Sequence, residues 1–403
     1  MDDHFLDHKL NERRSQDAFR RLRLPEGATD FCSNDYLGIV TNGLLENALP
    51  ASVPNPGSGP LGRLTHGSGG SRLLAGNYPL IEATERTLAA FHQAEAGLLF
   101  NSGYDANTGV LSCIPQRGDT ILYDSLSHAS IRDGIRLSFA RSFSFAHNDC
   151  ADLEKRLRSA RSEDASRSDT ASRSDAAQTP APTGDARPNL FVVTESVFSM
   201  DGDLAPLASI LDLCRRYEAH LIVDEAHATG VIGPAGEGLV QLQGLQQECF
   251  ARIHTFGKAV GCHGAIVLGS ARLRDFLINF SRPFIYTTAL PPASVMAIAK
   301  AYALFPGLHK ERLRLQQSIE RFQQAAIGYE RLKSTTPIQV VVVPGNTAVR
   351  QLAESLQQAG LDIRPILYPT VPKGGERLRI VIHAFNTPEE MDRLIALLQG
   401  NAK

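Results

Sequence analysis

Short apolar runs recur along the first two thirds of the chain, separated by stretches with helical spacing. The runs that predict strands lie at residues 97–100, 120–123, 190–194, 221–223, 252–255 and 265–268. Between them, apolar positions from Leu80 to Phe91 repeat with the period of one helix face. Uninterrupted apolar strands that alternate with helices are typical of a mostly parallel sheet buried on both faces. We therefore expect an α/β fold whose ligands lie at the carboxyl ends of the strands.

The pattern changes near residue 280. The elements that follow are a long amphipathic helix with an apolar stripe from Leu315 to Tyr329, strands at 338–343, 362–367 and 377–382, and helices at 347–358 and 387–398. They predict a small C-terminal α+β domain over residues 281–403. A large domain over 46–280 and an N-terminal helical segment over 1–45 precede it. Residues 159–188 have no periodicity and are rich in Ser, Ala, Asp and Arg, which predicts a flexible surface insertion.

Composition and charge argue against several classes of protein, among them nucleic-acid-binding, membrane and disulfide-stabilised proteins. The 403 residues carry a formal net charge of −2, so we expect no broad attraction to nucleic acid. No apolar run approaches the roughly 18 residues of a membrane span, and the charged N-terminal stretch lacks the apolar core of a signal peptide. The six cysteines are scattered without Cys-x-x-Cys spacing, which predicts neither a metal site nor a disulfide framework. A cytoplasmic protein without membrane or nucleic-acid partners is expected.

One lysine is placed unusually. Lys258 lies among Phe256, Gly257, Ala259 and Val260, just before the apolar run at 265–268. A lysine with apolar and glycine neighbours is a candidate nucleophilic amine, able to form Schiff bases. An isolated Phe-Gly-Lys is more often a surface lysine in a glycine-rich turn, so other motifs must decide.

A carboxylate and a histidine end one of the predicted strands. The run at 221–223 leads directly into Asp224 and His227, one strand–helix–strand unit before Lys258. A buried aspartate is costly to desolvate without a partner. An amine and a carboxylate are the two protein groups that pyridoxal phosphate requires. Taken alone, the segment is equally compatible with an aspartate that caps a turn and a histidine on the surface.

Other strand ends supply groups of the same kind. The motif NSGY at 101–104 stands between a strand and a helix, where backbone N–H groups can bind a phosphate. His128, at the end of DSLSH, could stack on a flat ring, although a lone histidine is more often a hydrogen-bonded loop residue. The segment ESVFSMDGD at 195–203 follows a further strand. Polar residues after successive strands predict one cleft at a single edge of the sheet.

The glycine-rich segment HGSGGSRLLAG at 66–76 lacks the Gly-Lys-Ser/Thr ending of a P-loop. Glycine allows close approach of the backbone to another group. We therefore expect this backbone to lie close to a ligand or to a partner chain.

Nine motifs in order resemble the α-oxoamine synthases. They are SNDYLG, GSGGSRLLAG, NSGYDAN, DSLSHASIRDG, ESVFSMDGD, DEAHATG, HTFGKAVG, FIYTTALPP and PTVPKGGERLRI, and they span nearly the whole chain apart from residues 159–188. Enzymes of this family have the aminotransferase fold type I, bind pyridoxal 5'-phosphate, and join an amino acid to an acyl-CoA with loss of carbon dioxide. The resemblance implies a seven-stranded, mostly parallel sheet covered by helices. It also implies a homodimer with active sites at the subunit interface.

The resemblance implies roles for individual residues. Lys258 resembles the catalytic Schiff-base lysine, Asp224 the partner of the pyridine nitrogen, and His128 the histidine that stacks on the ring and orients the substrate. The other cofactor contacts it implies are His227 at the ring hydroxyl, Gly103 and Tyr104 at the phosphate, Ser199, Thr255, and, from the neighbouring subunit, Thr287 and Thr288. The implied substrate contacts are Asn34 and Arg379 for the amino-acid carboxylate, and Thr370 and Arg20 for the acyl group.

The motif PTVPKGGERLRI and the compact N-terminus are most similar to the biotin-pathway branch of the family. That branch uses L-alanine and a pimeloyl thioester of CoA or of a carrier protein. The alternatives are a glycine-using family member, an aminotransferase of the same fold, and a non-enzymatic cofactor-binding protein. The complete set of Lys258, Asp224, His227 and His128 argues against the last alternative.

Overall fold

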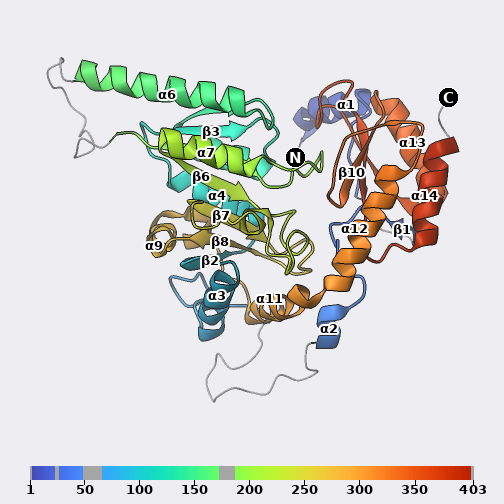
Figure 1. The fold of residues 1–403 in the computed structure, drawn as a ribbon, viewed down its shortest axis with the longest axis horizontal. Coiled ribbons are helices and arrows are strands. Elements are labelled where there is room, and N and C mark those ends of the chain that lie inside the picture. Colours follow the sequence, from blue (N-terminus) through green and yellow to red (C-terminus); the bar gives the residue numbers. More distant parts are fainter. Residues whose placement is uncertain (1, 23–26, 49–65, 172–186, 401–403) are drawn as a thin grey trace. The chain divides into compact units, whose positions relative to one another are not determined.

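A computed structural model describes residues 2–22, 27–48, 66–171 and 187–400 of the chain (Figure 1). The chain divides into two compact units. The large unit comprises Gly43–Phe198 and Leu204–Gly307, and the small unit comprises Met1–Asn42, Ser199–Asp203 and Leu308–Lys403. In the described part of the chain, no helix is both long and apolar enough to cross a membrane.

The large unit is built on a seven-stranded sheet with the order β2-β8-β7-β6-β5-β3-β4. The strands are β2 (Ala96–Phe100), β3 (Thr120–Asp124), β4 (Arg141–Phe145), β5 (Leu190–Glu195), β6 (Ala219–Asp224), β7 (Ala251–Thr255) and β8 (Ala265–Gly269). Strands β3 to β7 are parallel to one another, whereas β8 is antiparallel to both β7 and β2. The mostly parallel, seven-stranded sheet predicted from the sequence is confirmed.

The large unit also contains helices. They are α2 (Leu44–Ala48), α3 (Pro79–Phe91), α4 (Gly103–Cys113), α5 (Ala129–Leu137), α6 (Cys150–Ala171), α7 (Leu207–Tyr217), α8 (Leu239–Leu242), α9 (Ala271–Phe280), α10 (Arg282–Ile285) and α11 (Pro292–Leu304). Of these helices, α3, α4, α6, α7 and α9 contact strands of this sheet. Helices α4, α5 and α9 bury Val110, Ile131 and Leu277 against strand residues such as Phe191 and Val193. Every residue of β5 is buried, which explains its uninterrupted apolar run.

The small unit contains an antiparallel sheet with the order β12-β13-β10-β9, and a separate parallel pair of β1 and β11. Its strands are β1 (Thr29–Asp30), β9 (Glu330–Arg331), β10 (Ile338–Val342), β11 (Leu361–Asp362), β12 (Arg364–Ile366) and β13 (Arg377–Val381). Its helices are α1 (Asp7–Ser15), α12 (His309–Gln324), α13 (Asn346–Gln358) and α14 (Pro388–Gly400). The predicted α+β character of the C-terminal region is confirmed.

Several element boundaries differ from the prediction. The N-terminal helix ends at Ser15 because Asp17 adopts a left-handed conformation, with φ of 51°. Helix α12 ends at Gln324, short of Tyr329, and the N–H of Gly328 donates to Leu398 O in α14 instead of continuing the helix. Helix α11 packs on α3 and belongs to the large unit, so the compact units separate after Gly307 rather than near residue 280.

The expected insertion at 159–188 begins as a helix. Helix α6 continues to Ala171 because no glycine or proline interrupts the stretch before Pro180, and Ala, Arg and Glu favour helix. The part of the predicted insertion from 172 to 186 lies outside the described residues. Strand β4 was missed because its residues are partly exposed at the edge of the sheet, so RSFSF shows no apolar run.

Helices α4 and α5 meet at a glycine. A Cβ at Gly134 would lie 2.9 Å from Leu111 Cβ and 3.0 Å from Asn107 O. We expect Gly134→Ala to lower the free energy of unfolding by about 1–3 kcal/mol, because overpacking forces the two helices apart. Urea denaturation measures the change. Gly400→Ala, at a helical glycine with nothing within 4 Å of the added atom, is the matched control. Equal effects of the two substitutions would contradict close packing at Gly134.

Candidate active site

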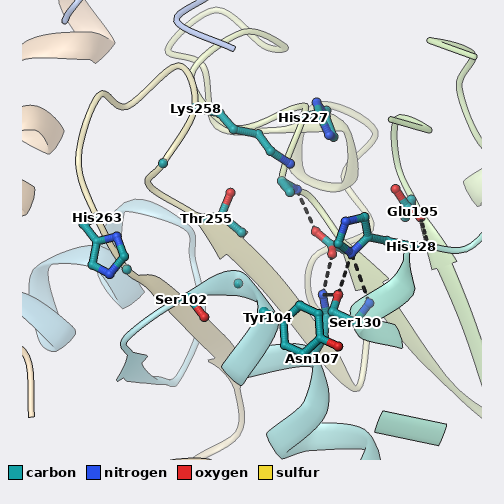
Figure 2. A pocket seen from close by; sticks show the side chains of 15 residues that line it. Ser102, Tyr104, Asn107, His128, Ser130, Glu195, His227, Thr255, Lys258 and His263 are labelled. Atoms are coloured by element: carbon teal, nitrogen blue, oxygen red, sulfur yellow. Dashed lines mark hydrogen bonds between the residues drawn. The ribbon is translucent and has the colours of Figure 1, made fainter. Parts of the chain in front are cut away.

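A cavity of about 230 Å³ opens in the large unit where strands β5, β6 and β7 end (Figure 2). Its walls come from the start of α4, the start of α5, the residues that follow β6, and the loop between β7 and β8. The carboxyl ends of parallel strands are where α/β proteins bind ligands. The single cleft predicted from the polar strand ends is therefore present.

Lys258 and Asp224 line this one cavity. The Asp224 residue is only 6% exposed. Its Oδ1 accepts a hydrogen bond from the N–H of Ala226 at 2.9 Å, and its Oδ2 accepts one from Asn107 Nδ2 at 2.7 Å. These two donors offset the cost of burying a carboxylate and fix its orientation. Figure 2 shows the Lys258 side chain entering the pocket from the same side as His227, opposite Asn107.

Two polar residues of the pocket, Asn107 and Ser130, were given no role from the sequence. Asn107 Nδ2 also donates to Ser130 Oγ at 3.1 Å, so one amide links helix α5 to the carboxylate of Asp224. The signal was available in the motif NSGYDAN. Asn107 stands four residues after Gly103, which places both on the same face of α4.

His128 caps the start of helix α5, and hydrogen bonds hold both its backbone and its ring. Its backbone N–H donates to Glu195 Oε1 at 2.6 Å, and its ring Nδ1 accepts from the N–H of Ser130 at 3.2 Å. An accepting Nδ1 leaves the proton of the neutral ring on Nε2. Burial lowers the pKa of His128, opposed by the negative charge of Asp224 and aided by the positive charge of Lys258. The ring is therefore a neutral, flat group in the pocket at pH 7.

Glu195 ends strand β5 in the wall of the pocket. Burial and the nearby Asp224 raise the pKa of Glu195 to about 8. The side chain is therefore mostly protonated at pH 7 and adds no second negative charge beside Asp224.

The start of α4 forms a cradle for an anion. Ser102 caps this helix by accepting from the N–H of Asp105 at 3.0 Å, and the first N–H groups of a helix have no intrahelical partner. A Cβ at Gly103 would come within 2.3 Å of Thr255 Cγ2, so only glycine fits there. Among the described residues, the buried Thr255 Oγ1 has no hydrogen-bond partner. The pocket thus fits pyridoxal phosphate, with an anion cradle at one end and Asp224 at the other.

The predicted cofactor residues of the large unit fall into two groups. Those that line the pocket are Gly103, Tyr104, His128, Asp224, His227, Thr255 and Lys258. Thr287 and Thr288 lie outside this lining, between α10 and α11. Thr287 is half-buried and Thr288 is exposed.

The small unit brings together the remaining predicted residues. Arg379 Nε donates to Ser199 O at 2.7 Å, and Arg379 NH2 donates to Asn34 Oδ1 at 3.0 Å. Arg20 NH2 donates to Thr370 Oγ1 at 3.4 Å. Residues far apart in the sequence thus form the two pairings, Asn34 with Arg379 and Arg20 with Thr370, that were predicted to hold the amino acid and the acyl group.

Comparison with known proteins gives consistent results. A family model described as "Aminotransferase class I and II" matches residues 26–398. A putative 8-amino-7-oxononanoate synthase of Bacillus licheniformis is 39% identical over 98% of this chain and 96% of its own length. The 8-amino-7-oxononanoate synthase of Emericella nidulans is 40% identical over 95% of this chain and 92% of its own length.

Solved structures with the same fold include two acyltransferases. Serine palmitoyltransferase of Sphingomonas wittichii has a TM-score of 0.82 and 25% identity, with 99% of this chain and 98% of that chain covered. The 8-amino-7-oxononanoate synthase of Francisella tularensis has a TM-score of 0.69 and 25% identity, covering 93% of this chain and 97% of that chain.

The protonated Glu195 predicts a pH dependence of stability in the cofactor-free protein. The folded state keeps a proton that the unfolded state releases above pH 4.5, so this residue's contribution to stability falls as the pH rises from 4.5 to about 8. We expect Glu195→Gln to lose that part of the dependence, because glutamine does not ionise. Urea denaturation across this range measures it, with the exposed Glu354→Gln as control. If wild type and Glu195→Gln gave parallel profiles, Glu195 would be ionised in the folded state.

Proposed function

Because this chain belongs to the class I and II aminotransferase family, and within it to the α-oxoamine synthases, we propose that it condenses L-alanine with a pimeloyl thioester. The chain is a pyridoxal-phosphate-dependent C-acyltransferase similar to the 8-amino-7-oxononanoate synthases of biotin biosynthesis. The proposed products are 8-amino-7-oxononanoate, carbon dioxide and the free thiol of CoA or a carrier protein. The observation that carries the proposal is that Lys258 and Asp224 line one cavity.

Pyridoxal phosphate supplies an aldehyde that reacts with amines and a ring that accepts the electron pair released at the α-carbon. Lys258 Nζ is the group proposed to hold the aldehyde carbon covalently. The same Nζ would also be the general base that takes the α-proton of alanine. Asp224, held by hydrogen bonds from Ala226 and Asn107, is proposed to keep a proton on the ring nitrogen, so that the ring could accept charge.

The neighbouring side chains orient the reactants. His227 lines the pocket and is proposed to hydrogen-bond the ring hydroxyl. The neutral His128 ring is proposed to stack on the cofactor ring and to shield one face. Gly103, Tyr104 and Thr255 are proposed to hold the phosphate at the start of α4, with Ser199 as a further cofactor contact.

The residues proposed to contact the substrates are Asn34, Arg379, Arg20 and Thr370. Arg379, already hydrogen-bonded to Asn34, has the planar fork that binds a carboxylate through two hydrogen bonds, and it would hold the carboxyl group of alanine. Arg20 and Thr370 would contact the acyl group. The proposed new bond would join the α-carbon of alanine, in place of its α-proton, to the acyl carbon, and the thiolate would leave. Loss of the carboxyl group as carbon dioxide would then leave an electron pair at the α-carbon, which takes up one proton.

We further propose a homodimer in which Thr287 and Thr288 contact the phosphate held by the neighbouring subunit. The exposure of Thr288 in the single chain supports this arrangement. The cytoplasmic setting expected from the sequence remains a prediction.

The role of Lys258 has a spectroscopic test. We expect Lys258→Ala to lose the visible absorption of the covalently held cofactor and to lose turnover, because no other residue is proposed to supply the amine. Lys310→Ala, at an exposed position on α12, is the control and should keep both. Turnover by Lys258→Ala at the wild-type rate would refute the mechanism.

The proposed substrates have a direct test. Purified enzyme is given glycine, L-alanine or L-serine, each with acetyl, pimeloyl or palmitoyl thioesters, and release of the free thiol is followed. We expect the highest kcat/KM with L-alanine and the pimeloyl thioester. Preference for glycine would identify another α-oxoamine synthase, and preference for serine with the palmitoyl thioester would match the serine palmitoyltransferase relatives. Formation of pyridoxamine phosphate without thiol release would identify an aminotransferase.

A further inference from the structure

The segment at 287–290 is held in place by an unusual number of hydrogen bonds from side chains. Three successive carbonyl groups of this segment each accept from a different side chain. Asn101 Nδ2 donates to Thr288 O at 2.8 Å, Ser68 Oγ to Ala289 O at 2.8 Å, and Tyr78 OH to Leu290 O at 2.7 Å. In addition, the N–H of Ala289 donates to Gly70 O at 2.9 Å.

Water could satisfy the carbonyl of Thr288, because this residue is exposed. The neighbouring Tyr286 is 74% exposed as well. A side-chain hydrogen bond at such a position gives little net stability, but it fixes the direction of the backbone. The bond from Asn101 therefore fixes the direction of the Thr288 carbonyl at an exposed position of the segment.

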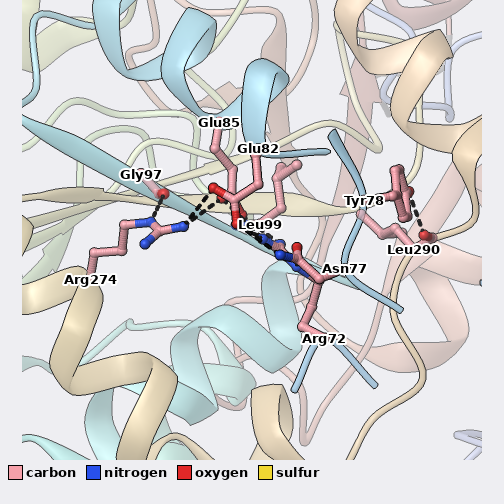
Figure 3. A network of polar contacts seen from close by, with 9 residues as sticks. All are labelled: Arg72, Asn77, Tyr78, Glu82, Glu85, Gly97, Leu99, Arg274 and Leu290. Carbon is pink, nitrogen blue, oxygen red and sulfur yellow. Dashed lines mark hydrogen bonds and ion pairs between the residues drawn. The ribbon is translucent and has the colours of Figure 1, made fainter. Parts of the chain in front are cut away.

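The groups that hold the segment are themselves anchored by a buried ion network (Figure 3). Arg72, in the glycine-rich segment at 66–76, contacts Glu85 of α3 at 2.7 Å, and Glu85 also accepts from the N–H of Leu99 in β2 at 2.9 Å. Arg274 of α9 contacts the same carboxylate at 3.2 Å. One partner of such a buried pair cannot move without exposing the other, so the backbone around Arg72 is fixed relative to β2.

Asn101 occupies a distinctive place in this arrangement. It follows the last residue of β2 and directly precedes Ser102, the residue that caps α4 at the anion cradle. Its side chain, however, bonds Thr288, which lies outside the lining of that pocket. Asn101 thus lies next to the start of α4 in its own chain. It also fixes the backbone of the segment at 287–290, which is proposed to reach the phosphate site of the other chain.

We propose that Asn101 is a positioning residue for the cofactor phosphate of the neighbouring subunit. It acts by holding the Thr288 carbonyl, so that the threonine side chains of the segment face the other chain. This inference rests on the proposed function, because it requires the homodimer in which Thr287 and Thr288 contact the neighbouring phosphate. The effect of removing the Asn101 amide should therefore appear in the partner's site and not in the site of the altered chain.

Mixed dimers separate the two sites. Two differently tagged chains are co-expressed, and one carries Lys258→Ala, so that only the other chain holds pyridoxal phosphate covalently. Adding Asn101→Ala to the Lys258→Ala chain should raise the dissociation constant of the intact site for pyridoxal phosphate about five-fold. This is the change in affinity that corresponds to the loss of one hydrogen bond. The measurement is the visible absorption as pyridoxal phosphate is titrated into cofactor-free dimer, which needs no turnover.

The reverse arrangement tests the direction of the effect. With Asn101→Ala on the chain that keeps Lys258, we expect the dissociation constant of wild type. Asn279→Ala on the Lys258→Ala chain is the matched control, because Asn279 Nδ2 makes the same kind of bond to a carbonyl, Asp275 O, at 2.8 Å. Asn101→Asp, which keeps the size and removes the donor, replaces the alanine variant if that variant does not fold. If the dissociation constant rose only when Asn101→Ala is on the chain that keeps Lys258, the inference would be overturned.

Thr288→Ala on the Lys258→Ala chain distinguishes this inference from its premise. If Thr288→Ala weakens cofactor binding by the partner and Asn101→Ala does not, the positioning role of Asn101 is wrong and the shared site stands. If neither variant affects the partner, the shared-site homodimer of the proposed function is wrong as well.

Discussion

The buried carboxylate of Asp224 requires hydrogen-bond donors at fixed positions, and this requirement constrains the elements around it. A carboxylate that is almost fully removed from water needs donors at fixed positions, and it has two: the N–H of Ala226 in its own loop and the amide of Asn107 on α4. The second donor is in place only if α4 lies at the correct distance from the end of β6. That distance depends on the packing of α4 against α5, where Gly134 leaves no room for a side chain. Helix α4 therefore couples the packing of the core to the orientation of the Asp224 carboxylate.

Burial also sets the protonation of the groups around this carboxylate. It lowers the pKa of His128 and raises that of Glu195, so both are predominantly neutral at pH 7. Because these two side chains are neutral, a charge on a bound ring would interact mainly with Asp224 and Lys258, the charged groups of the same pocket. The same helix start that carries Asn107 also offers free N–H groups for a phosphate, so the two ends of the pocket are aligned by α4.

The sequence predicted the parts of the fold that burial imposes. Strand β5 was predicted because its buried residues form an apolar run. Asp224 was singled out because it follows such a strand, and Lys258 because its neighbours are apolar residues and glycine; the structure places both in the lining of one pocket. Strand β4 was missed because an exposed edge leaves no apolar run. The end of α12 was missed because its apolar stripe continues past Gln324, whereas the backbone is already extended at Ala325 and the N–H of Gly328 bonds Leu398 O of α14. Asn107 was given no role because its partner is more than a hundred residues away, at position 224.

The order in which the chain is made has a consequence for how the small unit forms. Its first segment pairs through β1 with β11, Thr29 opposite Leu361, and the carbonyl of Phe31 accepts from the N–H of Val381. Its middle segment is held from the same late region, where Ser334 Oγ and Thr336 Oγ1 both donate to Gly202 O. During synthesis on the ribosome, residues 29 to 31 therefore lack their β partners until residues 361 to 381 have emerged. The large unit, whose strands end at Gly269, can complete its sheet well before that moment.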